Sequence, residues 1–312
     1  MKMNPTARRH HFLPQAYIAA FTKTGSKEDK FFVFDTSTGK SFCTSPLNVA
    51  VKRDFNRIDI DDMPIDALEQ NLSSFEGQVI KVIQKIIKSE EYPNDEDLNW
   101  VLNFLCLVAI RNPKLRKSFN DAQEQTLNKI GDILVSDKKI WDNYMKKIRE
   151  SGTIINENVS FEEMKDFIEN RKYVVKFHPS HNLDVEFETF DKILPMLGQR
   201  TWSIIIVPND GPGFICSDHP VSLAYKNGRS GPIGFALKET EVFFPLGRRI
   251  GLYGVFEDPL KSKVKARPIN VAIMNLRTFL NAEKHVFSSN GTFNIWYDGK
   301  IIEVPSNKKI DK

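Results

Sequence analysis

The chain has 312 residues, of which 41% are hydrophobic, and its formal net charge at pH 7 is +4. This length and composition can bury a substantial core and indicate a globular protein, while the small basic surplus does not identify a nucleic-acid-binding protein by charge alone. Three cysteines without C-x-x-C spacing support neither a disulfide framework nor a zinc cluster, so we expect a reducing compartment.

The first part of the chain is the most basic. Residues 1–60 carry ten Lys and Arg against five Asp and Glu, so this is the region predicted to contact nucleic acid if nucleic acid is a partner. Residues 1–11 lack the apolar core of a signal peptide, and no later run approaches the length of a membrane span. We therefore expect a cytoplasmic protein with no membrane partner.

The N-terminal elements are a short helix and a hairpin. Pro14 is placed to start an amphipathic helix that ends near residue 21. Two strand-like runs, residues 30–35 and 40–43, flank a polar stretch with the composition of a tight turn. This pattern predicts a β-hairpin.

The middle of the chain has a helical period. Apolar residues recur every three or four positions from Leu68 to Ile86, which predicts a long helix that starts near Pro64. Residues 97–110 are apolar on nearly every face and predict a buried helix. Further helices are predicted over residues 115–148, 161–170 (opened by a capping box at Ser160 and Glu163), 188–197 and 270–281.

The C-terminal part of the chain is rich in strand-like runs. Strands are predicted at residues 173–177, 201–207, 213–217, 241–244, 250–255, 286–287 and 293–297. We predict an α+β fold in which a helical middle layer packs on a mostly antiparallel sheet, built from the C-terminal half and the N-terminal hairpin. We find no flexible linker, so we expect one domain over residues 1–312, with sub-regions 1–60, 61–200 and 201–312.

One strand end is the strongest site candidate. The apolar run Phe214-Ile215-Cys216 is followed by Ser217-Asp218-His219-Pro220, which cannot continue a strand. A hydroxyl, a carboxylate and an imidazole therefore meet where rigid backbone passes into a loop, a common position for functional side chains.

Four segments together resemble one bacterial family. They are residues 11–18 (HFLPQAYI), Arg111-Asn112-Pro113 with Arg116, residues 214–220 (FICSDHP) and residues 244–246 (FPL). The family that the chain resembles is catalogued as domain of unknown function 4238, and the similarity spans nearly the whole chain. His219 stands where the family more often has asparagine. Some members are similar to proteins carried in phage-defence islands, so the resemblance implies an antiviral setting and no mechanism.

Two candidate residues are a carboxylate and a histidine. Asp218 could be a metal ligand or an acid–base group, or it could bond the backbone of its own turn. His11 could be a general base or a metal ligand, or it could fix the N-terminal segment onto the core. A metal bound by Asp218 and His11 would be a divalent cation such as Mg²⁺.

Two further candidates lie on the predicted helices. Arg111 could grip a phosphate, or it could pair with helix carbonyls and a carboxylate such as Glu76. Glu76 follows Glu69 by seven residues and so lies on nearly the same helix face. The two carboxylates could bind Mg²⁺ or simply form a solvated face.

Functions of two different classes remain open. No P-loop, dinucleotide-binding, zincin or hydrolase-elbow motif occurs. The first function is a metal- or histidine-assisted nuclease of phage-defence type, in which His11, Asp218 and Glu76 bind a cation or move protons and Arg111 stabilises charge. The second is a non-catalytic sensor or interaction module in which this polar cluster is structural.

Overall fold

The computed structural model describes residues 9–57, 64, 67–153, 159–209, 211–257 and 263–305. The chain divides into two compact units. We call residues 1–114 and 179–312 the main unit and residues 115–178 the helical unit. A single domain over the whole chain stays a prediction, and each unit is considered by itself.

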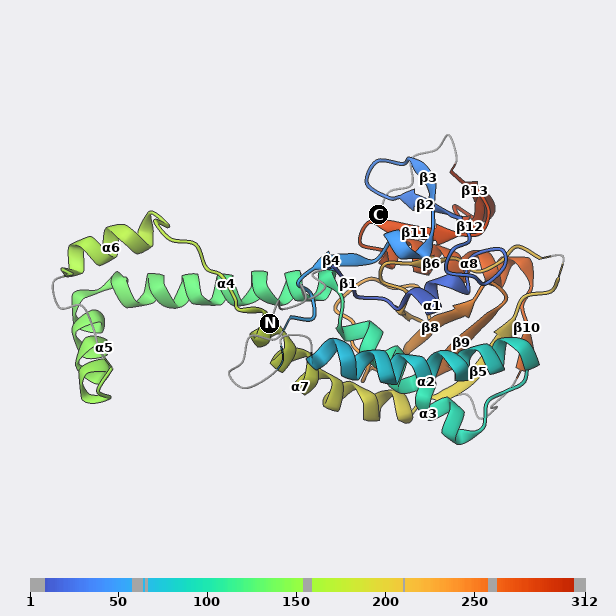
Figure 1. The fold of residues 1–312 in the computed structure, drawn as a ribbon. Coiled ribbons are helices and arrows are strands. Elements are labelled where there is room, and N and C mark those ends of the chain that lie inside the picture. The colour runs from blue at the N-terminus through green and yellow to red at the C-terminus, as the bar shows by residue number, and fades with distance from the viewer. Residues whose placement is uncertain are drawn as a thin grey trace. The chain divides into compact units, whose positions relative to one another are not determined.

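A five-stranded sheet lies at the centre of the main unit (Figure 1). Neighbouring strands are antiparallel except for the parallel pair at one edge, β10 and β5. In spatial order the strands are β10 (Lys263–Lys265), β5 (Thr201–Ile206), β9 (Ile250–Val255), β8 (Thr240–Gly247) and β7 (Ser222–Tyr225).

A second, four-stranded sheet contains the predicted hairpin. Its strands are antiparallel, and the hairpin pairs with the C-terminal part of the chain through Phe34 and Val286. The order is β3 (Ser41–Thr44), β2 (Phe31–Asp35), β11 (His285–Ser288) and β6 (Cys216–Ser217). Two-stranded sheets are formed by β1 (Arg9–His11) with β4 (Val51–Arg53) and by β12 (Phe293–Tyr297) with β13 (Lys300–Val304). The predicted α+β class with a mostly antiparallel sheet is confirmed.

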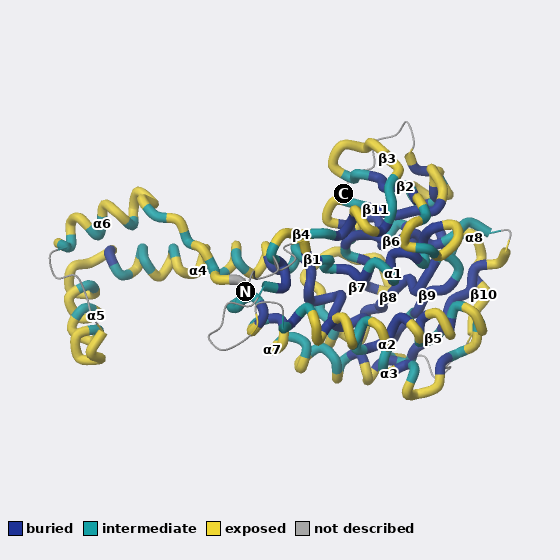
Figure 2. The backbone as a smooth tube through the Cα atoms, viewed as in Figure 1, coloured by how far each residue is buried: buried dark blue, intermediate teal, exposed yellow. Residues whose placement is uncertain are grey.

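Helices cover the five-stranded sheet. In Figure 1, α2, α3 and α7 lie together, and α2 also contacts β8. The helices of the main unit are α1 (Gln15–Ala19), the short 3₁₀ helix η1 (Pro46–Asn48), α2 (Ala67–Ser89), α3 (Asp95–Ile110), α7 (Pro179–Gly198) and α8 (Pro268–Asn281). One hydrophobic core contains residues of α1, α2, α3, β5, β8 and β9, and buried segments gather where these elements meet (Figure 2).

Tyr17 fixes α1 in this core. Its ring stacks on Phe244 at 5.3 Å and meets Phe104 edge-on at 5.4 Å between ring centroids. Its hydroxyl donates a hydrogen bond of 2.7 Å to the Pro245 carbonyl oxygen, so the buried polar end of the side chain is satisfied. α1 is thereby joined to both α3 and β8.

The helical unit corrects two sequence predictions. Its helices are α4 (Pro113–Ser136), which begins in the main unit, α5 (Lys138–Glu150) and α6 (Phe161–Glu169). The helix predicted over residues 115–148 is interrupted at Asp137, whose side chain caps α5 by accepting a hydrogen bond from the Lys139 amide. The strand predicted at residues 173–177 is absent. The Tyr173 ring stacks on Phe167 instead, and its hydroxyl donates to the Asn128 side chain.

The three cysteines are free thiols in different surroundings. Cys43 is exposed on β3, whereas Cys106 and Cys216 are buried. Burial raises the pKa of each buried thiol to about 12. The buried thiols are therefore protonated and unreactive at neutral pH. Within the described residues, no helix is long and apolar enough to cross a membrane.

Candidate functional site

A polar hollow of about 280 Å³ lies between β1, α1 and α2. We call it the His11 hollow. Its lining combines an imidazole, two carboxylates, an ammonium and an amide: His11, Glu69, Glu76, Lys27 and Gln15. The structure thus brings together two of the predicted site residues, His11 and Glu76.

Both carboxylates come from α2, because residues seven positions apart lie on nearly the same face of a helix. Glu69 and Glu76 are two turns apart and share a face that lies beside the buried apolar stripe of the helix. Gly77 also lines the hollow, and a Cβ atom at this position would meet no atom within 4 Å. A glycine inside a helix costs about 0.5–1 kcal/mol relative to alanine. Here its missing side chain keeps the hollow open.

His11 reaches the hollow from the end of β1, where it pairs in register with Val51 of β4. The Gln15 Nε2 atom lies 3.3 Å from each ring nitrogen of His11. Burial lowers the pKa of His11, and the charges of Arg9 and Lys27 lower it further. The hydrogen bond to the Leu47 backbone and the charge of Glu69 oppose this shift without reversing it. The imidazole is therefore neutral at pH 7.

The pKa of Glu76 is shifted in the opposite direction to that of His11. Burial, followed by the negative charge of Glu69, raises the pKa of the Glu76 carboxyl to about 7. The charges of Arg111 and Lys27 partly oppose the rise. Near neutral pH this carboxyl is present in both its protonated and its ionised form, which is the condition for proton transfer in either direction.

Arg111 lies behind the hollow and acts through Asn56. Its Nη2 atom donates a 2.5 Å hydrogen bond to the Asn56 Oδ1 atom, and the side-chain Nδ2 atom of Asn56 donates to the Glu69 carboxylate. Its Nε atom lies 3.3 Å from the Glu186 carboxylate, and both side chains are buried. The carboxylate that forms the ion pair with Arg111 is thus Glu186 of α7 rather than Glu76. Arg111 holds Glu69 in place.

Asp218 lies elsewhere, at the end of β6. Its carboxylate accepts hydrogen bonds of 2.8 Å from the backbone amides of Glu283, Lys284 and His285. Its own amide donates to the His285 carbonyl oxygen at 3.0 Å. Asp218 therefore joins the end of β6 to the turn before β11, and it does not line the His11 hollow.

The neighbouring His219 is neutral as well, because burial lowers its pKa to about 4. Among the described residues, no group of three or more His, Cys, Asp or Glu side chains is placed to hold a metal ion. The predicted pairing of His11 with Asp218 around a cation is not assembled, since the two residues occupy different places in the fold.

The hollow and the Asp218 turn both fall within one family match. A family model described as "Protein of unknown function (DUF4238)" matches residues 9–292. The chain belongs to this family. No curated protein and no solved structure matches it. The match begins at β1 of this DUF4238 protein and so includes every residue that lines the His11 hollow.

Sequence reasoning missed several residues of the DUF4238 hollow. Gln15 could have been predicted, because it follows Pro14 in the opening motif and lies four residues after His11. Gly77 could also have been predicted, because it directly follows Glu76 on the same helix. Lys27 and Asn56 carry no local signal, since loops bring them to the site.

Replacing Glu76 by glutamine should stabilise the protein at high pH. The pKa of Glu76 is raised from 4.5 to about 7 in the folded protein. The neutral carboxyl therefore contributes stability below pH 4.5, and that stability is lost as the pH rises to about 7. Glutamine stays neutral, so the variant should gain about 1–3 kcal/mol over wild type between pH 4 and pH 8.

Urea unfolding at pH 4, 6 and 8 measures this gain. Glu188→Gln is the matched control, because the Glu188 side chain is 75% exposed on α7 and should show no such pH-dependent gain. Equal pH dependence in Glu76→Gln and wild type would show that the Glu76 carboxyl is solvated in the folded protein.

Proposed function

We propose that this protein is a cytoplasmic hydrolase of phosphodiester bonds, a nuclease of phage-defence type, in which His11 and Glu76 transfer protons. The observation that carries the proposal is the pairing in one hollow of a neutral imidazole with a carboxyl whose pKa is raised to about 7. The pKa of His11 is lowered from its ordinary value and that of Glu76 is raised to about 7, so at physiological pH the base is neutral and the acid is partly protonated.

In the proposed mechanism each group has one role. Neutral His11 takes the proton from the attacking water as its oxygen bonds to phosphorus, and protonated Glu76 gives its proton to the leaving oxygen as the other P–O bond breaks. Lys27 lines the same hollow and compensates the charge of the phosphate. Glu69 keeps the pKa of Glu76 high. Arg111 is a positioning residue, since it acts on Glu69 through Asn56.

The β1–β4 ribbon supports nucleic acid as the substrate. Arg9 pairs in register with Arg53, and His11 pairs with Val51 on the same face of the ribbon, because side chains alternate along a strand. Like charges directly opposite each other destabilise a strand pair. Asp54, 3.6 Å from the Arg53 guanidinium, compensates part of this charge, and a phosphate between Arg9 and Arg53 would compensate the rest. Phosphate contacts of this kind position a nucleic acid without reading its sequence.

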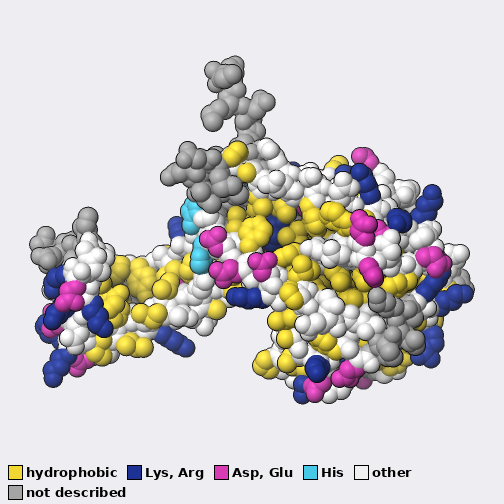
Figure 3. All heavy atoms as spheres, turned by 90° about the horizontal axis from the view of Figure 1, so that it is seen from below, with side chains coloured by type: hydrophobic (Ala, Val, Ile, Leu, Met, Phe, Trp, Pro, Cys, Tyr) yellow, Lys and Arg dark blue, Asp and Glu magenta, His cyan; other side chains and the backbone are white. Residues whose placement is uncertain are grey.

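Charge is mixed on one further face of the main unit. On the face of the main unit shown in Figure 3, Lys and Arg side chains stand interspersed with Asp and Glu, and no continuous basic field covers it. This distribution favours a local contact at the ribbon over a broad electrostatic surface for duplex DNA. A single-stranded substrate suits a local contact better.

Cleavage of single-stranded RNA and DNA oligonucleotides tests the proposal. His11→Asn and Glu76→Gln should each lower the cleavage rate by about 10²–10⁴-fold, the usual contribution of a positioned acid or base. Glu188→Gln is again the control and should retain full activity. The wild-type rate should follow a bell-shaped pH profile, and Glu76→Gln should lose the limb that falls as the pH rises through about 7.

Two further measurements separate the alternatives. If EDTA abolishes cleavage and Mg²⁺ restores it, the mechanism is assisted by a metal ion rather than by proton transfer from His11 and Glu76 alone. The interaction-module function is favoured by the buried contacts of Arg111 and Asp218, which join separate segments of the chain. If cells that carry the His11→Asn or the Glu76→Gln variant keep full protection against phage, the result would support the interaction module and contradict the nuclease.

A further inference from the structure

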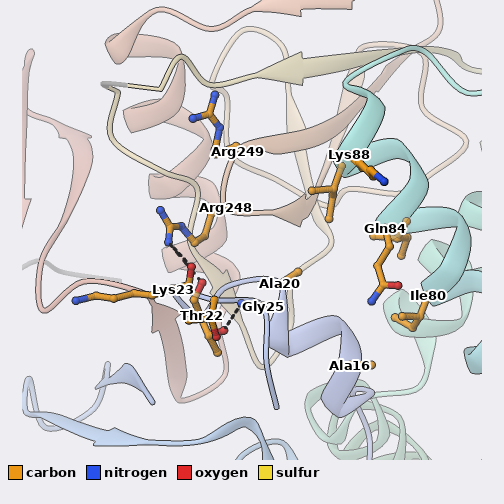
Figure 4. A pocket seen from close by; sticks show the side chains of 13 residues that line it. Ala16, Ala20, Thr22, Lys23, Gly25, Ile80, Gln84, Lys88, Arg248 and Arg249 are labelled. Atoms are coloured by element: carbon orange, nitrogen blue, oxygen red, sulfur yellow. Dashed lines mark hydrogen bonds between the residues drawn. The ribbon is translucent and has the colours of Figure 1, made fainter. Parts of the chain in front are cut away.

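A second hollow, of about 370 Å³, lies on the other side of the contact between α1 and α2. Figure 4 shows the two helices facing each other across it, with the β8–β9 turn on a third side. Its apolar wall is formed by Ala16 of α1, by Ala20, which directly follows α1, and by Ile80, Ile83 and Ile87 of α2. Ile80 and Ile83 are buried in the hydrophobic core, whereas Ala16, Ala20 and Ile87 are half-buried.

The rim of this hollow is cationic. Lys23, Lys88, Arg248 and Arg249 line it, and among the described residues no acidic side chain does. The Arg248 guanidinium lies 3.5 Å from the Lys23 carbonyl oxygen, which holds it at the edge. Arg249 is partly neutralised by Glu90, 3.7 Å away outside the lining. Figure 4 shows these cations spread around the hollow, with the Lys23 side chain extending away from Lys88. We call this space the cationic hollow.

We propose that the cationic hollow binds a small organic anion with an aliphatic body, a medium-chain carboxylate. The volume falls in the range of small-molecule sites, which are mostly apolar with a few polar groups that fix orientation. The isoleucine and alanine wall accepts an alkyl chain, and the rim supplies charge complementarity for its head group. None of the described residues that line the hollow is aromatic, so a nucleobase would find no stacking partner among them.

Titration of the full chain with octanoate tests the assignment, read by calorimetry and by the rise in Tm that a ligand of the native state causes. Octanoate should bind, while octanol, which lacks the charge, and inorganic phosphate, which lacks the tail, should each bind at least tenfold more weakly. Binding of octanol as tight as that of octanoate, or of phosphate alone, would overturn the proposal. So would tighter binding of adenosine monophosphate, which would make the site a nucleotide site.

Variants locate the binding. Ala20→Leu fills the apolar wall and Lys88→Gln removes one rim charge, and each should weaken octanoate binding by tenfold or more. Lys81→Gln is the matched control, because Lys81 is an exposed lysine of the same helix outside the lining. His11→Asn should bind octanoate as wild type does, so this result is independent of the nuclease test. The Lys88 side chain is exposed, so unchanged affinity in Lys88→Gln would show that the rim charge takes no part in binding.

Discussion

Leu105→Ala should lower the free energy of unfolding by about 2–5 kcal/mol, through lost burial and the cavity left behind. Leu105 is fully buried in the middle of α3, within the core shared by the helices and the five-stranded sheet. Interiors are packed closely, so the neighbouring elements can collapse onto the space only in part.

Equilibrium unfolding in urea measures the change. Leu280→Ala provides the same substitution on α8 at a side chain that is 42% exposed, and it should cost less than about 1 kcal/mol. Similar losses in the two variants would mean that α3 is not at the centre of the core.

Asp218→Asn should have the second large effect, a loss of about 2–4 kcal/mol in the free energy of unfolding. The carboxylate accepts three backbone hydrogen bonds, and bonds to a charged acceptor contribute about 1.5–3 kcal/mol each. Asparagine keeps one acceptor oxygen and turns an N–H₂ group toward N–H donors. Burial raises the pKa of Asp218 against these bonds, which reduces the net loss below their sum.

The control is Asp184→Asn, which makes the same change at an exposed position on α7 and should leave stability unchanged. Loss of nuclease activity in Asp218→Asn with unaltered urea unfolding would return this carboxylate to the catalytic groups. Loss of both together is the outcome that the backbone contacts predict.

Local patterns in the sequence identify most of the elements of the fold. The apolar period of α2, the all-round apolar surface of α3 and the capping box that opens α6 are each confirmed. Local patterns failed where an element needs a partner. Residues 173–177 have strand-forming side chains, yet Tyr173 packs on Phe167 of α6, and the described part of the helical unit contains no strand with which it could pair.

The candidate site divides in the same way. Helical spacing placed Glu69 and Glu76 together, because both lie on one continuous element. Their approach to His11 depends on the pairing of β1 with β4, which are about 40 residues apart in the chain, and no local signal encodes that pairing. At Asp218 the alternative of bonds to backbone amides was right in kind but wrong in the partner, because the amides belong to a segment more than 60 residues away and not to its own turn.

The unequal burial of the cysteines makes this chain suited to site-specific labelling. Cys43 stands exposed on β3, whereas the other two thiols lie inside the core with their pKa values raised to about 12. Maleimide dyes react with thiolates in contact with solvent, so the native protein offers a single attachment point without any cysteine having to be replaced. A dye at Cys43 reports from the four-stranded sheet, four residues before Leu47, whose backbone forms a hydrogen bond with His11.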